Sequence, residues 1–335
     1  MIYPKFPKDS ESIGICAPSA GVGHKLESFD ASLNSIKKIG FNILETESVR
    51  IDDIRPADGH ARAEEYHSLI RNKDVSSIIA ATGGEYNIEV LPYLDSNLIR
   101  QHPKWLCGYS DPTNILYYLT TKLDIASIYG FNAGTFDWNP LHRFQTNALE
   151  ILRGNIIEQE SFDYYDSDRS FGITDFNMDT AVSWDLYMPA KNEPVTDRQC
   201  FTGRLIGGCT DIITRLLGTP YDGTSDFVSR YKNDGFIWYF DTFEMSPISL
   251  YCSMLQFRYA GMFTNAKAVI IGRVMFPGDA TDEEYIEHLK LAFPDIPFIW
   301  GADIGHTKPC MTIINGSMGY LETENGKAKL NMELI

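Results

Sequence analysis

The chain has 335 residues, of which 44% are hydrophobic and 22% are charged, and its formal net charge is -16. This length exceeds the usual size of a single hydrophobic core and predicts two domains, and the composition is that of a soluble folded protein. The excess of acidic groups argues against nucleic acid and anionic membrane surfaces as partners, because both require clustered Lys and Arg.

The N-terminal half alternates apolar strand patterns with amphipathic helix patterns. A buried-strand pattern covers residues 12–20, and a helix pattern follows over residues 25–40. Further strands are predicted at residues 41–46, 75–84, 104–110 and 126–130, and helices at residues 61–72, 87–94 and 112–122. This alternation predicts a Rossmann/flavodoxin-like α/β domain with a parallel sheet over residues 1–155.

The C-terminal half is richer in β-structure. Residues 156–184 are polar and aromatic without clear periodicity, and we expect them to connect the two domains. Strand patterns follow at residues 235–241, 266–274 and 297–302, and helix patterns at residues 209–218 and 281–293. Residues 319–333 are predicted to form a hairpin with Asn325-Gly326 at its turn. We therefore expect a β-rich α+β domain over residues 185–335.

Several motifs are missing from the sequence. The N-terminus lacks a signal-peptide pattern, and no run approaches the roughly 18 apolar residues that a membrane span needs. The six cysteines lack Cys-x-x-Cys spacing and several lie in apolar runs, so we expect buried thiols in a reducing compartment. Neither metal-ligand spacing, nor a phosphate loop, nor a dinucleotide-binding glycine pattern is present. The sequence thus predicts a cytoplasmic protein with no metal and no cofactor.

Ser110 lies at the joint between a predicted strand and a predicted helix, in the stretch Gly108-Tyr109-Ser110-Asp111-Pro112. A serine at such a turn can project its hydroxyl as a nucleophile, while the N–H groups that open the helix face the developing oxyanion. The stretch does not match Gly-x-Ser-x-Gly. Ser110 or Asp111 could instead only cap the helix, and the local sequence leaves both interpretations open.

A nucleophilic serine needs a base, and the base needs an acid that orients it. Among the seven histidines, His306 stands out because it follows a predicted strand and lies between Gly305 and a Thr-x-Pro loop. Asp241 ends a very hydrophobic strand, where an unpaired carboxylate would be costly to bury. Asp241 could equally cap the following turn, and Glu244 is a competing acid.

Six stretches, taken in order, resemble the LD-carboxypeptidase family of serine peptidases, which includes muramoyl-tetrapeptide carboxypeptidases and microcin C immunity proteins. The stretches are IGICAPSAG, AATGGEYNIEVLPYLD, CGYSDPTNIL, GRLIGGCTDIITRLLGTPY, IWYFDTFE and IGHTKPCMTI. They extend from about residue 12 to residue 316. The most specific are residues 108–111, a predicted glycine turn at residues 205–208, and Gly305-His306.

The resemblance implies a Ser–Glu–His triad in that chain order, spread over an α/β N-terminal domain and a β-rich C-terminal domain. On the matching positions, Ser110 is the nucleophile, His306 the general base and Asp241 the acid. The family usually has Glu where this chain has Asp241, which is one methylene shorter. Either the backbone compensates, or Glu244 takes the role, or the site is impaired.

The resemblance also implies which residues face the substrate. Backbone N–H groups of Asp111, Gly84 and Glu85 would hold the oxyanion. Trp184 lies where the immunity branch has an aromatic residue that can stack on a base, although a lone Trp can also simply pack in the core. Glu244 is a further expected substrate contact.

The implied reaction is hydrolysis of an amide bond through an acyl-enzyme. The expected substrate is either a murein peptide that loses a terminal D-amino acid or a microcin-type peptidyl-nucleotide, with the aromatic residues favouring the second. A homodimer is also implied. The alternatives are a catalytically impaired two-domain protein that binds a small molecule, and a nucleotide- or sugar-dependent α/β enzyme, against which the missing phosphate loop counts.

Overall fold

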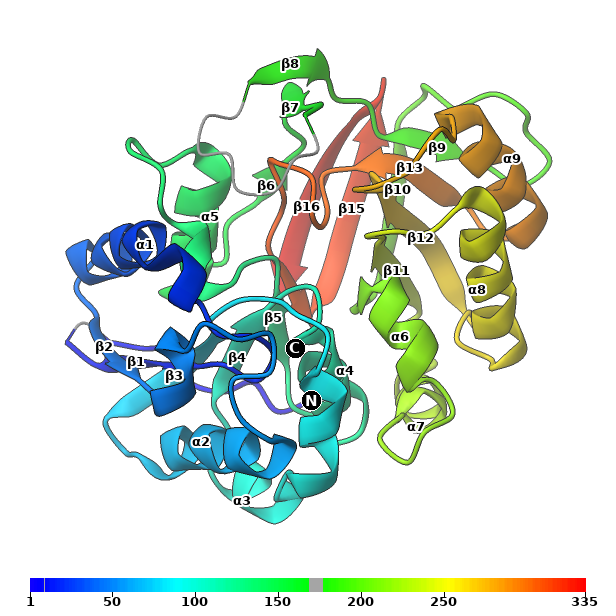
Figure 1. Ribbon diagram of the computed structural model, residues 1–335. Coiled ribbons are helices and arrows are strands. Elements are labelled where there is room, and N and C mark those ends of the chain that lie inside the picture. Colours follow the sequence, from blue (N-terminus) through cyan, green and yellow to red (C-terminus); the bar gives the residue numbers. More distant parts are fainter. Residues whose placement is uncertain (9, 169–176) are drawn as a thin grey trace. The chain divides into compact units, whose positions relative to one another are not determined.

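The computed structural model describes residues 1–8, 10–168 and 177–335 of the chain. These residues form two compact units, Met1–Ile156 and Ile157–Ile335 (Figure 1). The predicted connection over residues 156–184 falls almost wholly in the second unit, and residues 169–176 of it lie outside the described residues.

The first unit is built around a parallel sheet with the strand order β5-β4-β3-β1-β2. Its strands are β1 (Ser12–Cys16), β2 (Asn42–Glu45), β3 (Val75–Ala80), β4 (Trp105–Gly108) and β5 (Ser127–Tyr129). Figure 1 shows α1 and α2 on opposite sides of these strands. A parallel sheet is covered on both faces, which explains why β3 and β4 are almost wholly buried.

Helices connect these strands and confirm the predicted Rossmann/flavodoxin-like class. They are η1 (Gly23–Lys25), α1 (Leu26–Lys38), η2 (Glu47–Arg50), α2 (Gly59–Arg71), η3 (Asn87–Tyr93), α3 (Ser96–Gln101), α4 (Thr113–Thr121), η4 (Ala133–Thr135) and α5 (Arg143–Leu152). Asp58 starts α2 by accepting a hydrogen bond from the Ala61 N–H, and Asp95 starts α3 in the same way.

The second unit is built around a mixed sheet with the strand order β6-β16-β15-β10-β11-β12-β13-β9. Its strands are β6 (Gln159–Glu160), β9 (Asp185–Tyr187), β10 (Gln199–Cys209), β11 (Phe236–Asp241), β12 (Ala266–Gly272), β13 (Phe298–Ala302), β15 (Met318–Glu324) and β16 (Lys327–Glu333). Neighbours from β10 to β13 run parallel, and the outer pairs run antiparallel. This sheet confirms the β-rich C-terminal domain.

Further elements complete the second unit. They are α6 (Thr210–Leu216), α7 (Thr224–Tyr231), α8 (Pro247–Tyr259), α9 (Asp282–Ala292), the short ribbon of β7 (Tyr164–Asp166) and β8 (Met178–Ala181), and β14 (Ile313–Asn315). Figure 1 shows α6, α8 and α9 along one side of the sheet. The predicted hairpin is present as β15 and β16, and both Asn325 and Gly326 have the positive φ that a tight hairpin turn requires.

The glycine turn predicted at residues 205–208 is wrong. These residues lie inside β10, in parallel register with residues 237–240 of β11. Gly207 approaches its neighbour so closely that an added Cβ would lie 1.8 Å from the Tyr239 carbonyl oxygen. Glycine therefore serves close strand packing here and not chain reversal.

The predicted burial of the cysteines is confirmed only in part. All six are free thiols; Cys16, Cys107, Cys209 and Cys310 are buried, whereas Cys200 and Cys252 are exposed. The prediction of buried thiols is therefore wrong for two of them, because neither the outer part of β10 nor α8 buries its cysteine. No helix among the described residues combines the length and the apolar character needed to cross a membrane.

Candidate active site

Ser110 lies at the carboxyl end of β4, where the chain turns toward α4. Its φ is 68°, a left-handed conformation that is uncommon for a non-glycine residue and that recurs in strained turns at functional sites. Its N–H donates to the Tyr129 hydroxyl at 3.4 Å, and its carbonyl accepts from the Thr113 N–H at 2.9 Å. The N-cap position of α4 is held by Pro112 and by neither Ser110 nor Asp111.

The loop after β3 comes close to Ser110 at the carboxyl edge of the parallel sheet, the place where open α/β sheets bind ligands. Gly83 approaches so closely that an added Cβ would lie 3.2 Å from Ser110 Oγ. Gly84 and Glu85 are exposed, and their N–H groups donate no hydrogen bond to any described residue. Both groups can therefore donate to an incoming oxyanion.

Two buried charged side chains hold the loops around Ser110. The Asp111 carboxylate, 1% exposed, accepts a hydrogen bond from the Asn87 N–H at 2.8 Å. Arg62, also 1% exposed, donates to the Pro18 carbonyl at 2.7 Å and to the Tyr86 carbonyl at 3.2 Å. These contacts fix the loops after β1 and β3, because a buried charged group that lost its partners would be costly.

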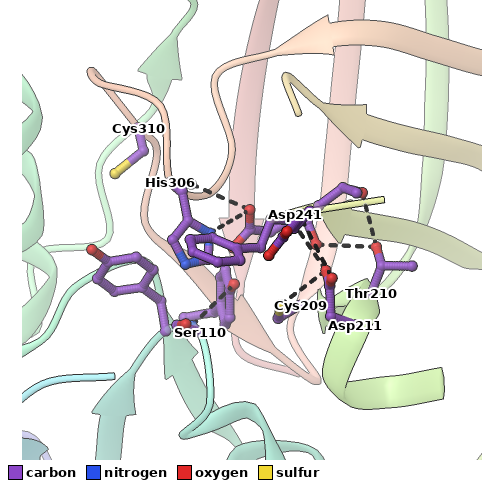
Figure 2. Close-up of polar contacts among 12 residues, drawn as sticks. Ser110, Cys209, Thr210, Asp211, Asp241, His306 and Cys310 are labelled. Carbon is purple, nitrogen blue, oxygen red and sulfur yellow. Dashed lines mark hydrogen bonds and ion pairs between the residues drawn. The ribbon is translucent and has the colours of Figure 1, made fainter. Parts of the chain in front are cut away.

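Asp241 and His306 form a buried hydrogen-bonded pair within the second unit, as Figure 2 shows. His306 Nδ1 lies 2.9 Å from Asp241 Oδ1 and 2.8 Å from Oδ2, and the His306 N–H donates to Oδ1 at 3.2 Å. Asp241 is 0% exposed and His306 is 6% exposed. A carboxylate at Nδ1 fixes the orientation of the imidazole and leaves Nε2 as the nitrogen that can accept a proton.

The start of α6 supports this pair (Figure 2). Thr210 Oγ1 donates to the Asp241 carbonyl at 3.0 Å, and the Asp211 carboxylate accepts from the Phe243 N–H at 3.0 Å. The Phe243 ring in turn packs against the His306 imidazole, with 4.7 Å between the ring centroids. The end of β11 and the ring beside the imidazole are therefore fixed by the same two residues of α6.

Arg273 holds the loop that carries His306. Its guanidinium forms an ion pair with Asp303 at 2.7 Å, and it donates to Thr307 Oγ1 at 3.1 Å and to the Gly301 carbonyl at 2.8 Å. Both members of the ion pair are buried, and such a pair is tolerated only when further hydrogen bonds satisfy it. The contacts fix the chain on both sides of His306.

Trp184 lies in the core of the second unit. It is 1% exposed, and its indole N–H donates to Asp303 Oδ2 at 3.0 Å. An enclosed ring offers no face to a ligand, so we correct the expectation that Trp184 stacks on a substrate base and assign the residue to the support of Asp303. A lone Trp carries no signal in the sequence that separates these two roles.

Glu244 is exposed, and its N–H donates to Asp211 at 3.4 Å. Of the two candidate acids, the structure brings Asp241 and not Glu244 to His306. The sequence does not decide between them, because Asp241 ends a hydrophobic strand and Glu244 lies only three residues further on.

The buried cysteines are poor alternatives to the serine. Burial raises the pKa of the Cys107 and Cys310 thiols, and for Cys209 the Asp241 and Asp211 carboxylates add to the effect of burial on the pKa. A thiol must ionise to act as a nucleophile or a metal ligand. Across residues 1–8, 10–168 and 177–335, no group of three or more His, Cys, Asp and Glu is arranged to hold a metal ion.

Gly305 lies directly against the Asp241 carboxylate, and its φ is 100°. An added Cβ would lie 1.9 Å from Asp241 Oδ1. We expect Gly305→Ala to displace the carboxylate and to lower kcat by about 100-fold, the effect of a misplacement of about 1 Å. The variant should also lose about 2–4 kcal/mol of stability, from the clash and the strained φ. Steady-state hydrolysis and thermal unfolding measure the two effects.

Gly278→Ala is the matched control. Gly278 also has a positive φ, 62°, but an added Cβ meets nothing within 4 Å. This control should cost only about 1 kcal/mol of stability, from the backbone conformation, and should leave kcat unchanged. Equal losses of kcat in the two variants would contradict a specific role for the space beside Asp241.

Serine hydrolases that act through an acyl-enzyme use a serine nucleophile together with a histidine that a carboxylate orients. Comparison with known families identifies the class. The family model described as the LD-carboxypeptidase N-terminal domain matches residues 13–130, and the one described as the C-terminal domain matches residues 202–321. The chain belongs to the LD-carboxypeptidase family of serine peptidases, as its sequence resemblance predicts.

Relatives cover nearly the whole chain. The microcin C7 self-immunity protein MccF of Escherichia coli is 23% identical over 92% of this chain and 89% of its own. A structure of MccF in complex with aspartyl sulfamoyl adenosine matches with a TM-score of 0.80 at 19% identity, covering 100% of this chain and 99% of that one. These matches share the fold from end to end.

Two further solved structures show the same fold. An MccF-like protein from Bacillus anthracis matches with a TM-score of 0.82 at 21% identity, covering 100% of both chains. A muramoyltetrapeptide carboxypeptidase from Oxalobacter formigenes matches with a TM-score of 0.73 at 21% identity, covering 96% of this chain and 99% of that one. The architecture predicted from the sequence, an α/β domain followed by a β-rich domain, is thereby confirmed.

Proposed function

We propose that this chain is an active serine carboxypeptidase or amidase in which Ser110 is the nucleophile, His306 the general base and Asp241 the acid that orients the base. The observation that carries the proposal is the buried pair of Asp241 and His306. A serine hydroxyl is a weak nucleophile, and an imidazole held at Nδ1 by a carboxylate is the base that activates it. The left-handed turn at Ser110 supports the same assignment.

In this mechanism, His306 Nε2 takes the hydroxyl proton as Ser110 Oγ attacks the carbonyl carbon of an amide. Backbone N–H groups of Gly84, Glu85 and Asp111 stabilise the oxyanion. The imidazolium then gives its proton to the leaving nitrogen, the C–N bond breaks, and an acyl-enzyme ester remains on Ser110. Water, deprotonated by the same imidazole, hydrolyses the ester and regenerates both residues.

Two substrate classes are supported. MccF and the MccF-like protein support a peptidyl-nucleotide substrate, and the muramoyltetrapeptide carboxypeptidase supports a murein peptide that loses a terminal D-amino acid. The burial of Trp184 takes this residue out of the aromatic argument that favours the nucleotide class. Glu244 stays a predicted substrate contact. A cytoplasmic homodimer, with a role in peptidoglycan recycling if murein peptides are the substrate, completes the proposal.

Labelling with a fluorophosphonate probe tests this function. We expect one adduct, on Ser110, that is absent from Ser110→Ala, because only an activated serine attacks phosphorus. Wild-type protein should also hydrolyse one of two compounds offered side by side, an L,D-tetrapeptide and a processed microcin-type aminoacyl-nucleotide. The absence of both adduct and turnover would refute the enzyme and favour a binding protein of the same fold.

A further inference from the structure

Lys25 is a half-buried cation at the junction of η1 and α1 in the first unit. Its ammonium donates a hydrogen bond to Thr82 Oγ1 at 3.1 Å and takes part in no ion pair with any residue that the structure describes. An ammonium has three N–H donors, so two are left for a ligand or for water. Burial lowers the pKa of Lys25, and the charge of Asp137 acts in the opposite direction. Among the described residues, no carboxylate is in contact with the Lys25 ammonium.

The position of Lys25 links it to the proposed nucleophile. Its partner Thr82 directly precedes Gly83, whose backbone lies against Ser110 Oγ, with 3.2 Å from an added Cβ to that oxygen. The loop that leads from β1 toward Lys25 contacts the same turn, because the Ala20 N–H donates to the Gly83 carbonyl at 3.3 Å. The ammonium therefore lies beside the turn that faces the nucleophile, and all of these residues belong to the first unit.

The charge of the whole chain makes this cation significant. With 45 acidic and 29 basic residues, the protein repels anions, and an anionic substrate needs a local positive group. A half-buried ammonium attracts an anion more strongly than an exposed one, because water and salt screen it less. Ammonium and carboxylate form a charge-assisted hydrogen bond, which is stronger than a bond between neutral groups.

We propose that Lys25 binds a carboxylate group of the substrate at a subsite beside the Ser110 turn. This inference deepens the proposed function and rests on it for the role of Ser110. The carboxylate has two possible sources. One is the terminal α-carboxylate of a peptide, and the other is the side chain of an acidic aminoacyl group, such as the aspartyl group in the ligand named for MccF.

Calorimetric binding to the full chain in a Ser110→Ala background tests this subsite without turnover. Two matched ligand pairs separate the sources: an L,D-tetrapeptide with a free or an amidated C-terminus, and aspartyl against asparaginyl sulfamoyl adenosine. In at least one pair, the carboxylate-bearing ligand should bind roughly tenfold tighter, as expected for one charge-assisted hydrogen bond. Lys25→Met should remove that preference, and Lys25→Arg should keep part of it.

Lys38→Met is the control, because Lys38 is exposed at the end of α1 and its loss changes the net charge equally. The preference should survive in Lys38→Met. The inference is overturned if Lys25→Met weakens both members of a pair equally, if both Lys variants act alike, or if none of the four ligands binds. Thermal unfolding checks that the variants fold, and Lys25→Gln replaces the Met variant if that one does not.

The experiments distinguish a failure of the proposed function from a failure of this inference. If wild-type protein forms no fluorophosphonate adduct, Ser110 is not an activated nucleophile, yet a carboxylate preference that depends on Lys25 would still be measured in the Ser110→Ala background. If the adduct forms and the preference is absent, the enzyme stands and the Lys25 subsite is refuted.

Discussion

Replacement of Ser110 by alanine is expected to lower kcat by roughly 10⁴- to 10⁶-fold, because loss of the nucleophile leaves only substrate binding and oxyanion stabilisation. The substitution removes one oxygen atom and keeps the left-handed backbone, so the melting temperature should change little. Steady-state release of the terminal residue or of the nucleotide measures the first effect. Retention of activity within tenfold of wild type would rule out Ser110 as the nucleophile.

Ser110→Gly gives this test a second, independent readout. Ser110 has a φ of 68°, which glycine adopts without strain. The glycine variant should be as inactive as the alanine variant but more stable than it by about 1 kcal/mol, the cost of a left-handed backbone for a residue with a Cβ. A glycine variant that is less stable than the alanine variant would show that the turn is not strained.

Replacement of Asp241 by asparagine should produce the second-largest loss. The neutral amide cannot stabilise the imidazolium, and its NH₂ group favours the wrong tautomer of His306, so we expect kcat to fall by about 10⁴-fold. The size of the residue is conserved, so the variant should still fold. Kinetic assays at several pH values measure the loss.

Two further variants in the second unit also lose one negative charge, one as a control and one as a test of the competing acid. Asp295 is exposed and forms an ion pair with the half-buried Arg258, so Asp295→Asn should lose at most about 1 kcal/mol of stability and no activity. Glu244→Gln tests the competing acid directly. If Glu244→Gln abolishes turnover and Asp241→Asn does not, Glu244 acts as the acid and our assignment is wrong.

Elements with strong local signals could be predicted from the sequence. The buried run that ends at Gly108, followed by Pro112, predicted β4 and α4, and the structure confirms both. A threonine with a glutamate three residues later marks the start of α9 as a capping box. In both cases the residues that determine the element are neighbours in the chain.

Elements that lack a strong local signal could not be predicted from the sequence. Helix α8 buries Leu250, Met254 and Phe257 at helical spacing, but its other face exposes Ile248 at 63% and Tyr259 at 80%. Apolar residues on both faces hide the period on which the prediction depends. β6 to β9 were also missed, since strands of two to four residues are too short to show an alternation.

The residues of the candidate site also fall into two groups, those that the sequence indicates and those that it does not. Ser110, Asp241 and His306 each sit at the end of a predicted strand or in a glycine loop, so the sequence alone marked them as candidates. The residues that position them leave no such mark, because their partners are distant in the chain. Arg62 meets Pro18 across 44 residues, and Arg273 meets Thr307 across 34.

The contacts of Arg273 have a consequence for how the protein meets its substrate. A loop that must be ordered by its ligand loses conformational entropy on binding, and the affinity falls accordingly. The loop around His306 is ordered instead by a buried guanidinium of the protein itself. The entropy of this loop is therefore lost when the chain folds, and a ligand that binds beside His306 does not have to order it.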